Sequence, residues 1–183
     1  MDDLEREKKK GLDRWYLKDV LLKRKLLGDK YHTPGFGLAA ELFASMCKAI
    51  IEKLGPDEGE AVIKEAVEYF GRQRGKRIAE TVKQMGKPLS FKNWLIYSDI
   101  SGENFAVKPD LDNGDLVVQV GTCQFMKAAE KWDLGEYAKI YCKYADYAIL
   151  EGYNPDIKLV LEDRGKTGKD HCLFRYLMKE ENK

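Results

Sequence analysis

The sequence has little of what usually identifies a chemical activity. Its 183 residues include only two histidines and four cysteines, and no two cysteines form a C-x-x-C pair. This spacing excludes the local signatures of a zinc ribbon and of a thioredoxin-like redox centre. The P-loop, the G-x-G-x-x-G dinucleotide fingerprint and the G-x-S-x-G turn of serine hydrolases are also absent.

Charge of one sign is not in excess either. The formal net charge is +1, whereas a dedicated nucleic-acid binder normally carries a basic excess. The charged N-terminus has no apolar segment of a signal peptide behind it, and no apolar run is long enough to span a bilayer. We therefore expect a cytoplasmic protein with reduced cysteines that binds neither nucleic acid nor membrane.

What the sequence does have is the composition of a globular domain. Hydrophobic residues make up 44% of it and charged residues 34%, which is typical of a folded chain rather than a disordered one. A chain of this length can close a core without disulfides or metals. We expect a single domain over residues 1–183, mainly helical over 1–101 and built from a hairpin, a helix and a second hairpin over 102–178.

Apolar residues recur at helical spacing through the first half of the chain. This pattern predicts helices over about 3–27, 37–54, 55–85 and 90–101, the last with Ser90 as its N-cap. Cys47 lies near the apolar face of the second helix and is expected to be buried. The expected apolar faces of the first two helices are Leu4, Leu12, Trp15, Tyr16, Leu22 and Leu26, and then Leu38, Leu42, Phe43, Met46, Ile50 and Leu54.

The second half of the chain changes to β patterning. Residues 105–108 and 116–120 are rich in β-forming side chains, and the Asp-Asn-Gly-Asp run between them predicts a hairpin turn. A helix over about 134–150 follows, and then strands over 157–161 and 171–178. The predicted fold is α+β, with N-terminal helices packed on a four-stranded antiparallel sheet and one helix inserted between the two strand pairs.

A stripe of small residues marks the third helix. Gly71, Gly75 and Ala79 are spaced by four and share one helix face. Glycine inside a helix costs roughly 1 kcal/mol relative to alanine, so the stripe indicates that another element, in the simplest case the sheet, or a ligand comes close. Arg72 and Arg77 beside it form either a solvated face or a site for a ligand carboxylate, which a guanidinium binds through two parallel hydrogen bonds.

Three cysteines fall on separate predicted elements that a fold can bring together. With Asp146 or His171, the thiols of Cys123, Cys142 and Cys172 could form a metal site, for which zinc is the usual ion. One of them could instead be a nucleophile, or all three could simply fill core space, which composition and spacing alone favour. Cys142 and Asp146 are four apart on one helix and can point at the same place.

The C-terminal half resembles the L-2-amino-thiazoline-4-carboxylic acid hydrolase family over roughly residues 60–178. Members of that family often have proline after the first cysteine, where this sequence has Gln124. The matching pieces are the segment from Phe70 to Gly75 with Ile78 and Ala79, Cys123, Tyr141 and Cys142 with Asp146, the segment from Glu151 to Pro155, Arg164, and the segment from Gly168 to Cys172 with Phe174.

The resemblance implies an enzyme that hydrolyses a cyclic amidine. Water attacks the carbon between nitrogen and sulfur, and the thiazoline ring opens to a carbamoyl-cysteine. The substrate is a small molecule that carries a carboxylate. The implied site has Cys123, Cys142 and Cys172 as nucleophile and neighbours or as ligands of a divalent metal such as zinc, Asp146 or Glu151 as general base, Arg72 or Arg77 at the substrate carboxylate, and Tyr141 and Asn154 as further binding residues.

The same order of features is similar to four-vinyl-reductase-type ligand-binding domains, which bind small molecules without sharing one reaction. That alternative predicts an enclosed apolar pocket lined by aromatic residues such as Tyr137, Tyr144 and Phe174, with no acid near the cysteines. A hydrolase predicts a polar cleft that an acid, a cysteine and an arginine share. A third alternative, a retained fold with lost or changed activity, stays open because of Gln124. The aromatic first helix suits either a homodimer contact or packing within the chain.

Overall fold

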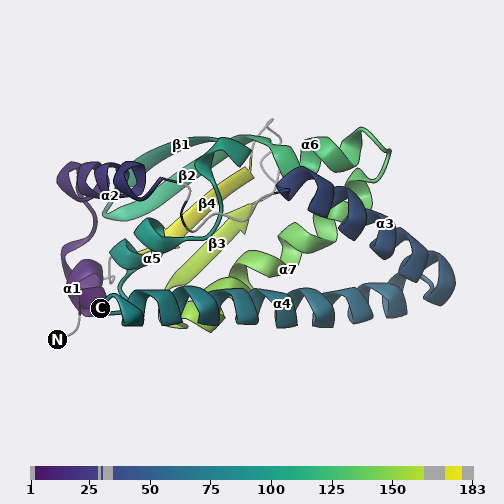
Figure 1. The fold of residues 1–183 in the computed structure, drawn as a ribbon, viewed down its shortest axis with the longest axis horizontal. Coiled ribbons are helices and arrows are strands. Elements are labelled where there is room, and N and C mark those ends of the chain that lie inside the picture. Colours follow the sequence, from purple (N-terminus) through teal and green to yellow (C-terminus); the bar gives the residue numbers. More distant parts are fainter. Residues whose placement is uncertain (1–2, 29, 31–34, 163–171, 179–183) are drawn as a thin grey trace.

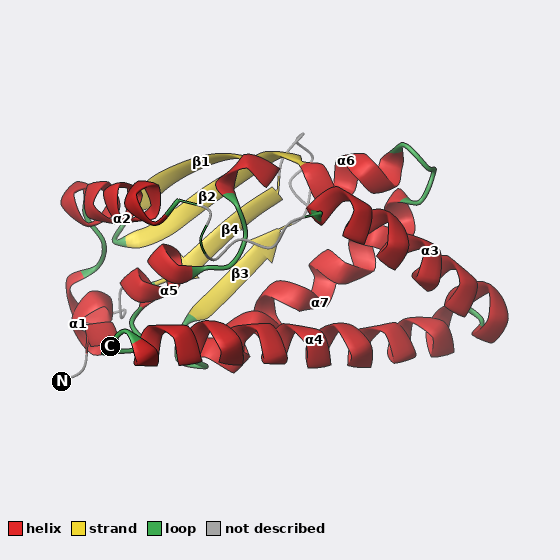
Figure 2. Ribbon diagram, viewed as in Figure 1, coloured by secondary structure: helices red, strands yellow, loops and turns green. Residues whose placement is uncertain are grey.

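The computed structural model describes residues 3–28, 30, 35–162 and 172–178. Within these ranges the chain is an α+β fold of seven α-helices and one four-stranded antiparallel sheet (Figures 1 and 2). The helices are α1 (Asp3–Lys10), α2 (Arg14–Leu27), α3 (Phe36–Leu54), α4 (Pro56–Gln84), α5 (Phe91–Tyr97), α6 (Gln124–Glu130) and α7 (Gly135–Tyr153), with a 3-10 turn η1 (Gly102–Asn104). The strands are β1 (Phe105–Asp112), β2 (Asp115–Cys123), β3 (Lys158–Glu162) and β4 (Cys172–Leu177).

The sheet has the strand order β1-β2-β4-β3, and all its neighbouring strands are antiparallel. The first hairpin turns at Asn113 and Gly114, whose φ angles of 53° and 92° suit the tight turn that such sequences favour. The second strand pair joins the first through β2 and β4, with Val118 opposite Phe174. The predicted fold is confirmed, including α7 as the helix inserted between the strand pairs.

The core lies between the sheet and the helices α4, α5 and α7. Figure 1 shows α4 running along most of the molecule, with α7 beside it. Leu116 of β2, Phe91 of α5 and Ile149 of α7 are buried in one apolar cluster. The rings of Phe91 and Tyr176, from α5 and β4, lie 5.0 Å apart between centroids. Because residues from every part of the chain enter this cluster, burial of its apolar surface ties the helical half to the sheet.

The stripe of small residues packs α4 against α7 rather than against the sheet or a ligand. A Cβ atom on Gly75 would lie 2.0 Å from the carbonyl oxygen of Ile149, and one on Gly71 would lie 2.7 Å from the Cβ atom of Ala148. From the other side, a Cβ atom on Gly152 would lie 2.2 Å from the carbonyl oxygen of Arg72. The two helix backbones therefore touch, which only glycine permits. α7 continues past Gly152, the expected stop, to Tyr153.

The single long helix expected over 3–27 is two helices. Gly11 has a φ of 71° and ends α1. The next amide, that of Leu12, donates a hydrogen bond of 2.9 Å to the carbonyl oxygen of Gly114 in the β1–β2 turn. The carboxylate of Asp13 then accepts from the amide of Tyr16 and caps α2. The break lets the chain dock on the hairpin, a partner distant in sequence that periodicity cannot reveal.

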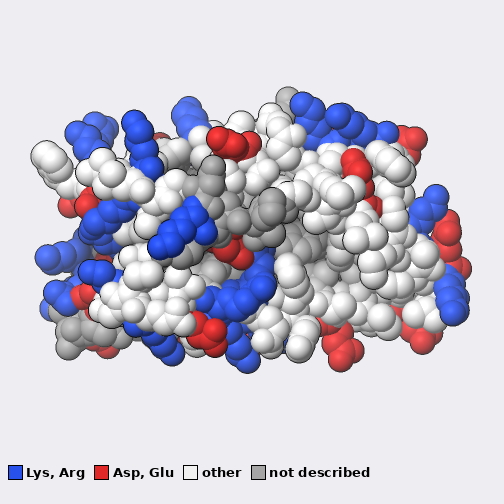
Figure 3. Space-filling model, in the orientation of Figure 1, with Lys and Arg blue, Asp and Glu red and all other residues white. Residues whose placement is uncertain are grey.

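The apolar faces of α2 and α3 agree with the expected ones only in part: Tyr16, Phe43 and Ile50 pack against the core, and other expected residues do not. In α3 the buried positions are Ala40, Ala44 and Cys47, which pack on α6 and α4, while Leu38 and Met46 are exposed. Figure 3 shows a largely uncharged surface on the half of the molecule that holds α3, and Lys and Arg gathered over the end formed by α1 and α2. In α2, the expected Trp15, Leu22 and Leu26 are exposed, and Val20 is buried.

Within the residues that the structure describes, no helix is both long enough and apolar enough to cross a bilayer. Burial raises the pKa of the Cys47 thiol to about 12, and the prediction that Cys47 is buried is confirmed. The N-cap role predicted for Ser90 is also confirmed, because its hydroxyl oxygen accepts from the amide of Asn93.

Glu7 of α1 holds the start of α5 from a distance. Its carboxylate accepts from the amides of Phe91 (2.6 Å) and Lys92 (2.7 Å) and from the hydroxyl of Tyr16 (2.9 Å). We expect Glu7→Ala to lower the free energy of unfolding by about 2–3 kcal/mol, since it leaves these partly buried donors without their acceptor. Urea unfolding tests this against Glu80→Ala, which changes an exposed acid of α4. Equal midpoints for the two variants would contradict the role.

Candidate functional site

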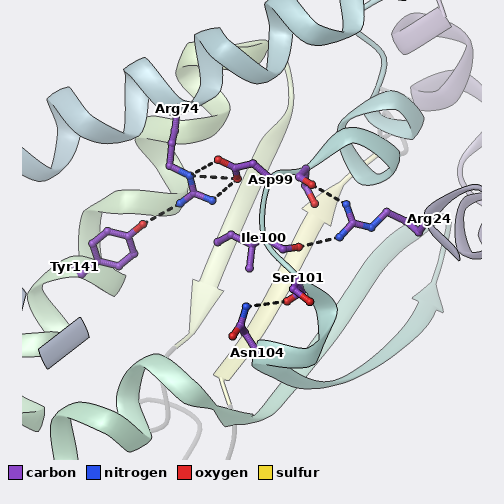
Figure 4. A network of polar contacts seen from close by, with 8 residues as sticks. Arg24, Arg74, Asp99, Ile100, Ser101, Asn104 and Tyr141 are labelled. Carbon is purple, nitrogen blue, oxygen red and sulfur yellow. Dashed lines mark hydrogen bonds and ion pairs between the residues drawn. The ribbon is translucent and has the colours of Figure 1, made fainter. Parts of the chain in front are cut away.

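A cluster of buried and partly buried polar side chains joins α4, α7 and the segment after α5. At its centre is Arg74, whose exposed fraction is only 7%. Its Nε atom donates to both carboxylate oxygens of Asp99, at 2.9 and 3.2 Å, and its Nη2 atom donates to one of them. Its Nη1 atom donates to the hydroxyl oxygen of Tyr141 at 2.9 Å (Figure 4). All three guanidinium nitrogens are therefore engaged.

The ion pair with Asp99 allows the buried guanidinium of Arg74 to remain charged. Burial disfavours the charged form of Arg74, but the hydrogen bonds to Asp99 keep its pKa above the ordinary value. Burial raises the pKa of Tyr141 to about 12, against the lowering effect of Arg74. Tyr141 is therefore a neutral hydroxyl near pH 7, and its oxygen accepts from Arg74.

Asp146 lies one turn further along α7 from Cys142 and belongs to the same cluster. Burial raises the pKa of Asp146 to about 6, and Arg74 opposes part of that rise. In turn Asp146 raises the pKa values of Tyr141, Cys142 and Tyr176, so these groups lie within its electrostatic reach. Its side chain keeps part of its accessible surface although protein atoms surround it. A carboxyl with a pKa near 6 suits acid–base chemistry.

The three cysteines of interest come together around Cys142. Cys123 is the last residue of β2, Cys172 is the first of β4, and each raises the pKa of the Cys142 thiol. The largest cause of that rise is burial, and Asp146 adds to it. A thiol with a raised pKa is protonated at neutral pH, and a thiol in that form is a poor nucleophile. The fold thus gathers the thiols with the acid, but in surroundings that do not activate Cys142.

The arginines expected at a ligand carboxylate lie elsewhere. Arg72 forms ion pairs with Glu68 and Glu151 at 3.6 and 3.4 Å, and Arg77 is exposed. The inward face of α4 is set by its glycine contacts with α7, so the arginine that turns inward is Arg74. Glu151, proposed as an alternative base, is exposed over 58% of its side chain in the pair with Arg72. It lies on the surface rather than with the buried acid.

The side chain of Asn154, predicted to bind substrate, instead forms hydrogen bonds with the backbone. Its side-chain nitrogen donates to the carbonyl oxygen of Leu89 at 2.9 Å, and its side-chain oxygen accepts from the amide of Asp156 at 3.0 Å. These bonds tie the end of α7 to the segment before α5. Tyr141 is the predicted binding residue that does lie in the cluster, where its ring also packs on Phe43 and Phe125.

Within the described part of the chain, the donor set does not fit the metal site that the sequence suggested. Among the described residues, no three His, Cys, Asp or Glu side chains are arranged to hold a metal ion. The thiols of Cys123, Cys142 and Cys172 therefore do not form a ligand set together with Asp146. Arg164 and His171, two further residues of the sequence pattern, lie outside the described residues.

A sequence model of the L-2-amino-thiazoline-4-carboxylic acid hydrolase family matches residues 35–176, which is most of the chain. The chain belongs to this family. A search of curated proteins and a search of solved structures each found no match. The region shared with the hydrolase family holds α3 to β4 and with them the whole polar cluster, whereas α1 and α2 precede it.

Two residues of this polar cluster, Arg74 and Asp99, were not singled out from the sequence. Arg74 lies three residues after Gly71 and four before Ile78, both of which are buried. An arginine on the inward face of a helix needs a buried partner for its charge. The spacing of Arg74 from Gly71 and Ile78 could therefore have indicated a buried ion pair. Asp99 follows α5 in a segment with no periodic pattern, so nothing in the sequence marks it.

We expect Arg74→Met to raise the pKa of Asp146 further above 6, because Arg74 is the cation that lowers it. The variant also leaves Asp99 without its partner and should lose about 3 kcal/mol of stability. Carboxyl ¹³C chemical shifts give the first result and urea unfolding the second. Lys76→Met, an exposed change on the same helix, is the control. An unchanged Asp146 titration in folded Arg74→Met would contradict the assignment.

Proposed function

We propose that this protein hydrolyses a small cyclic amidine of the L-2-amino-thiazoline-4-carboxylic acid type and breaks a carbon–nitrogen bond of the ring. Membership of the hydrolase family supports the substrate class. The observation that carries the chemistry is Asp146, a desolvated carboxyl with a pKa of about 6 that lies near Arg74 and the Cys142 thiol.

The substrate and this carboxyl complement each other. A cyclic isothiourea is a strong base, so near neutral pH it is protonated and its charge spreads over both nitrogens and the carbon between them. A carboxylate in low-dielectric surroundings attracts such a cation more strongly than one in water. Protonation also makes the ring carbon more electrophilic. Ionised Asp146 can therefore bind the amidinium group and remain close to the carbon that water attacks.

Asp146 then transfers a proton in two steps, first from water to its own carboxylate and then to the ring nitrogen. As general base it takes a proton from water, while the water oxygen bonds to the ring carbon and gives a tetrahedral intermediate. As general acid it gives that proton to the ring nitrogen, and the carbon–nitrogen bond breaks as the hydroxyl oxygen of the intermediate becomes the carbonyl oxygen. The hydroxyl proton passes to the leaving amine, which ends as an ammonium group. The product is a carbamoyl-cysteine with the carbamoyl group on sulfur. One water is consumed, no redox change occurs, and Asp146 returns to its ionised form.

The remaining groups of the cluster shape the site in this proposal. Arg74 limits the rise in the pKa of Asp146, so a useful fraction stays ionised at neutral pH. The Cys142 thiol stays protonated and supplies a compact, weakly polar wall. The competing binding-module function required no acid near the cysteines. The influence of Asp146 on Cys142 supports the hydrolase instead.

Incubation of the purified protein with L-2-amino-thiazoline-4-carboxylate tests this function. Loss of the ring and appearance of carbamoyl-cysteine are followed by ¹³C NMR and mass spectrometry, in buffer alone and with heat-denatured protein as controls. The proposal expects multiple turnovers and the sulfur-linked product. Saturable binding without any product from folded protein would favour the binding module, and a nitrogen-linked product would mean that the carbon–sulfur bond breaks instead.

A further inference from the structure

A second arginine, Arg24 of α2, forms hydrogen bonds with the backbone on both sides of Asp99. Its guanidinium donates to the carbonyl oxygens of Ser98 at 2.6 Å, Ile100 at 2.8 Å and Ile96 at 3.3 Å. These alternate residues run from the last turn of α5 into the segment that follows it, where Ser98, the C-cap, has φ −55° and ψ 142°. One side chain thus fixes the path of five consecutive residues.

Asp99 is held from two opposite sides. Figure 4 shows Arg24 and Arg74 on opposite sides of the segment, with the Asp99 carboxylate directed towards Arg74. Arg24 bonds the carbonyl oxygens before and after Asp99, while Arg74 bonds its side chain. A guanidinium has five donors in a rigid fork, so it can satisfy several acceptors at once in a way that an ammonium cannot.

We infer that Arg24 is a positioning residue of the hydrolase site, which acts through Asp99 to hold Arg74 in place beside Tyr141 and Asp146. The chain of contacts runs from α2 to the loop after α5, then to α4 and finally to α7. Because Arg24 lies before the family-matched residues 35–176, the N-terminal helices contribute to the site and not only to the core. This inference rests on the proposed function.

Arg24 can affect the site because Arg74 stays in place only if Asp99, its partner, is itself fixed. Arg74 is almost fully buried, and its bonds to Asp99 and Tyr141 set where its charge lies relative to Asp146. Without Arg24, the segment that carries Asp99 loses three backbone anchors and the carboxylate becomes free to move. Displacements of about 1 Å in a catalytic constellation can cost up to about 100-fold in rate. A loss transmitted through two side chains should be smaller.

The test compares Arg24→Met, Asp99→Asn, the double variant and Arg24→Lys with Lys25→Met as control. Lys25 is the exposed neighbour of Arg24 on α2. Two quantities are measured well below the unfolding temperature of each variant. They are the kcat and KM of ring opening, and the pKa of Asp146 from its carboxyl ¹³C shift. The second does not depend on the substrate.

The inference expects Arg24→Met to lower kcat about tenfold with KM changed less than about twofold, and to shift the pKa of Asp146. The double variant should lose no more than Asp99→Asn alone, because both changes break one connection. Arg24→Lys should recover part of the loss, and Lys25→Met should match the wild type. Multiplicative losses in the double variant, or an unmoved Asp146 titration in Arg24→Met, would overturn the inference. A shifted titration without turnover in any protein would overturn the proposed function and leave the positioning intact.

Discussion

Asp146→Asn is expected to lower the rate of ring opening by 100-fold or more at pH 7.5. Asparagine keeps the shape of the side chain but can neither take a proton from water nor return one to the ring nitrogen. General acid–base groups typically contribute 10²–10⁴-fold. Steady-state assays test this against Glu136→Gln, which changes an exposed acid on the same helix. A residual activity above about one tenth would contradict the role of Asp146.

The same substitution is expected to make the protein more stable. The pKa of Asp146 is raised from 3.8 to about 6 in the folded state, so the folded protein binds the proton more tightly than the unfolded chain. The stability from this group is fully present below about pH 4 and is lost as pH rises through 6. An asparagine side chain does not titrate in this range, so the variant carries no such loss.

Asp146→Asn should therefore gain about 2 kcal/mol over the wild type above pH 7, and the gain should vanish near pH 4. Urea unfolding at both pH values measures the difference. A variant that is less stable than the wild type at pH 7.5 would argue that Asp146 is a structural residue. Gained stability with lost activity is the signature of a group kept for function at a cost to the fold.

Gly75→Ala is expected to lower stability by about 3–5 kcal/mol, or to prevent folding altogether. The new methyl group would lie 2.0 Å from the carbonyl oxygen of Ile149 and 2.7 Å from the amide nitrogen of Tyr153. Both are backbone atoms of α7, so relief requires the two helices to move apart. Overpacking of this kind outweighs the roughly 1 kcal/mol that alanine gains in a helix.

Gly37→Ala is the matched control for that prediction. Its added Cβ atom would meet the Cβ atom of Ala128 at 3.7 Å, an ordinary contact, and its backbone is helical. This variant should unfold at the same denaturant concentration as the wild type or gain up to about 1 kcal/mol. If Gly75→Ala unfolded within about 1 kcal/mol of the wild type, the α4–α7 contact would not be as close as described.

Local chemistry in the sequence predicted much of the fold. Gly55 and Pro56 mark the start of α4, and the Asn113–Gly114 turn marks the hairpin. Alternation identified the later strands, and together these features gave the α+β order. The predicted faces of α2 and α3 were only partly right, because which residues are buried depends on partners distant in sequence. In α3 the small residues Ala40 and Ala44 face α6 closely, and its larger leucines remain outside.

The candidate site, like the fold, was predicted where it depends on local spacing and missed where it depends on contacts between distant segments. Cys142 and Asp146 are neighbours on one helix face, which spacing reveals, and β2 and β4 bring the other thiols to them. Arg72 and Arg77 were chosen instead of Arg74, although its spacing from Gly71 and Ile78 placed Arg74 on the same helix face. The contact of Gly75 with α7 shows that this face turns inward. The roles of Asp99 and Arg24 arise between separate segments, because Asp99 pairs with Arg74 across 25 residues and Arg24 bonds Ser98 across 74. No local pattern carries that information.

The pH dependence of ring opening, measured beside the titration of the Asp146 carboxyl, tests the central claim most directly. The account predicts that kcat/KM rises with pH through a midpoint near 6, following the ionised fraction of the general base. The carboxyl ¹³C shift of Asp146 should titrate at the same midpoint, within about half a pH unit. A rate that stays constant down to pH 4.5, or an Asp146 that titrates near 4, would contradict it.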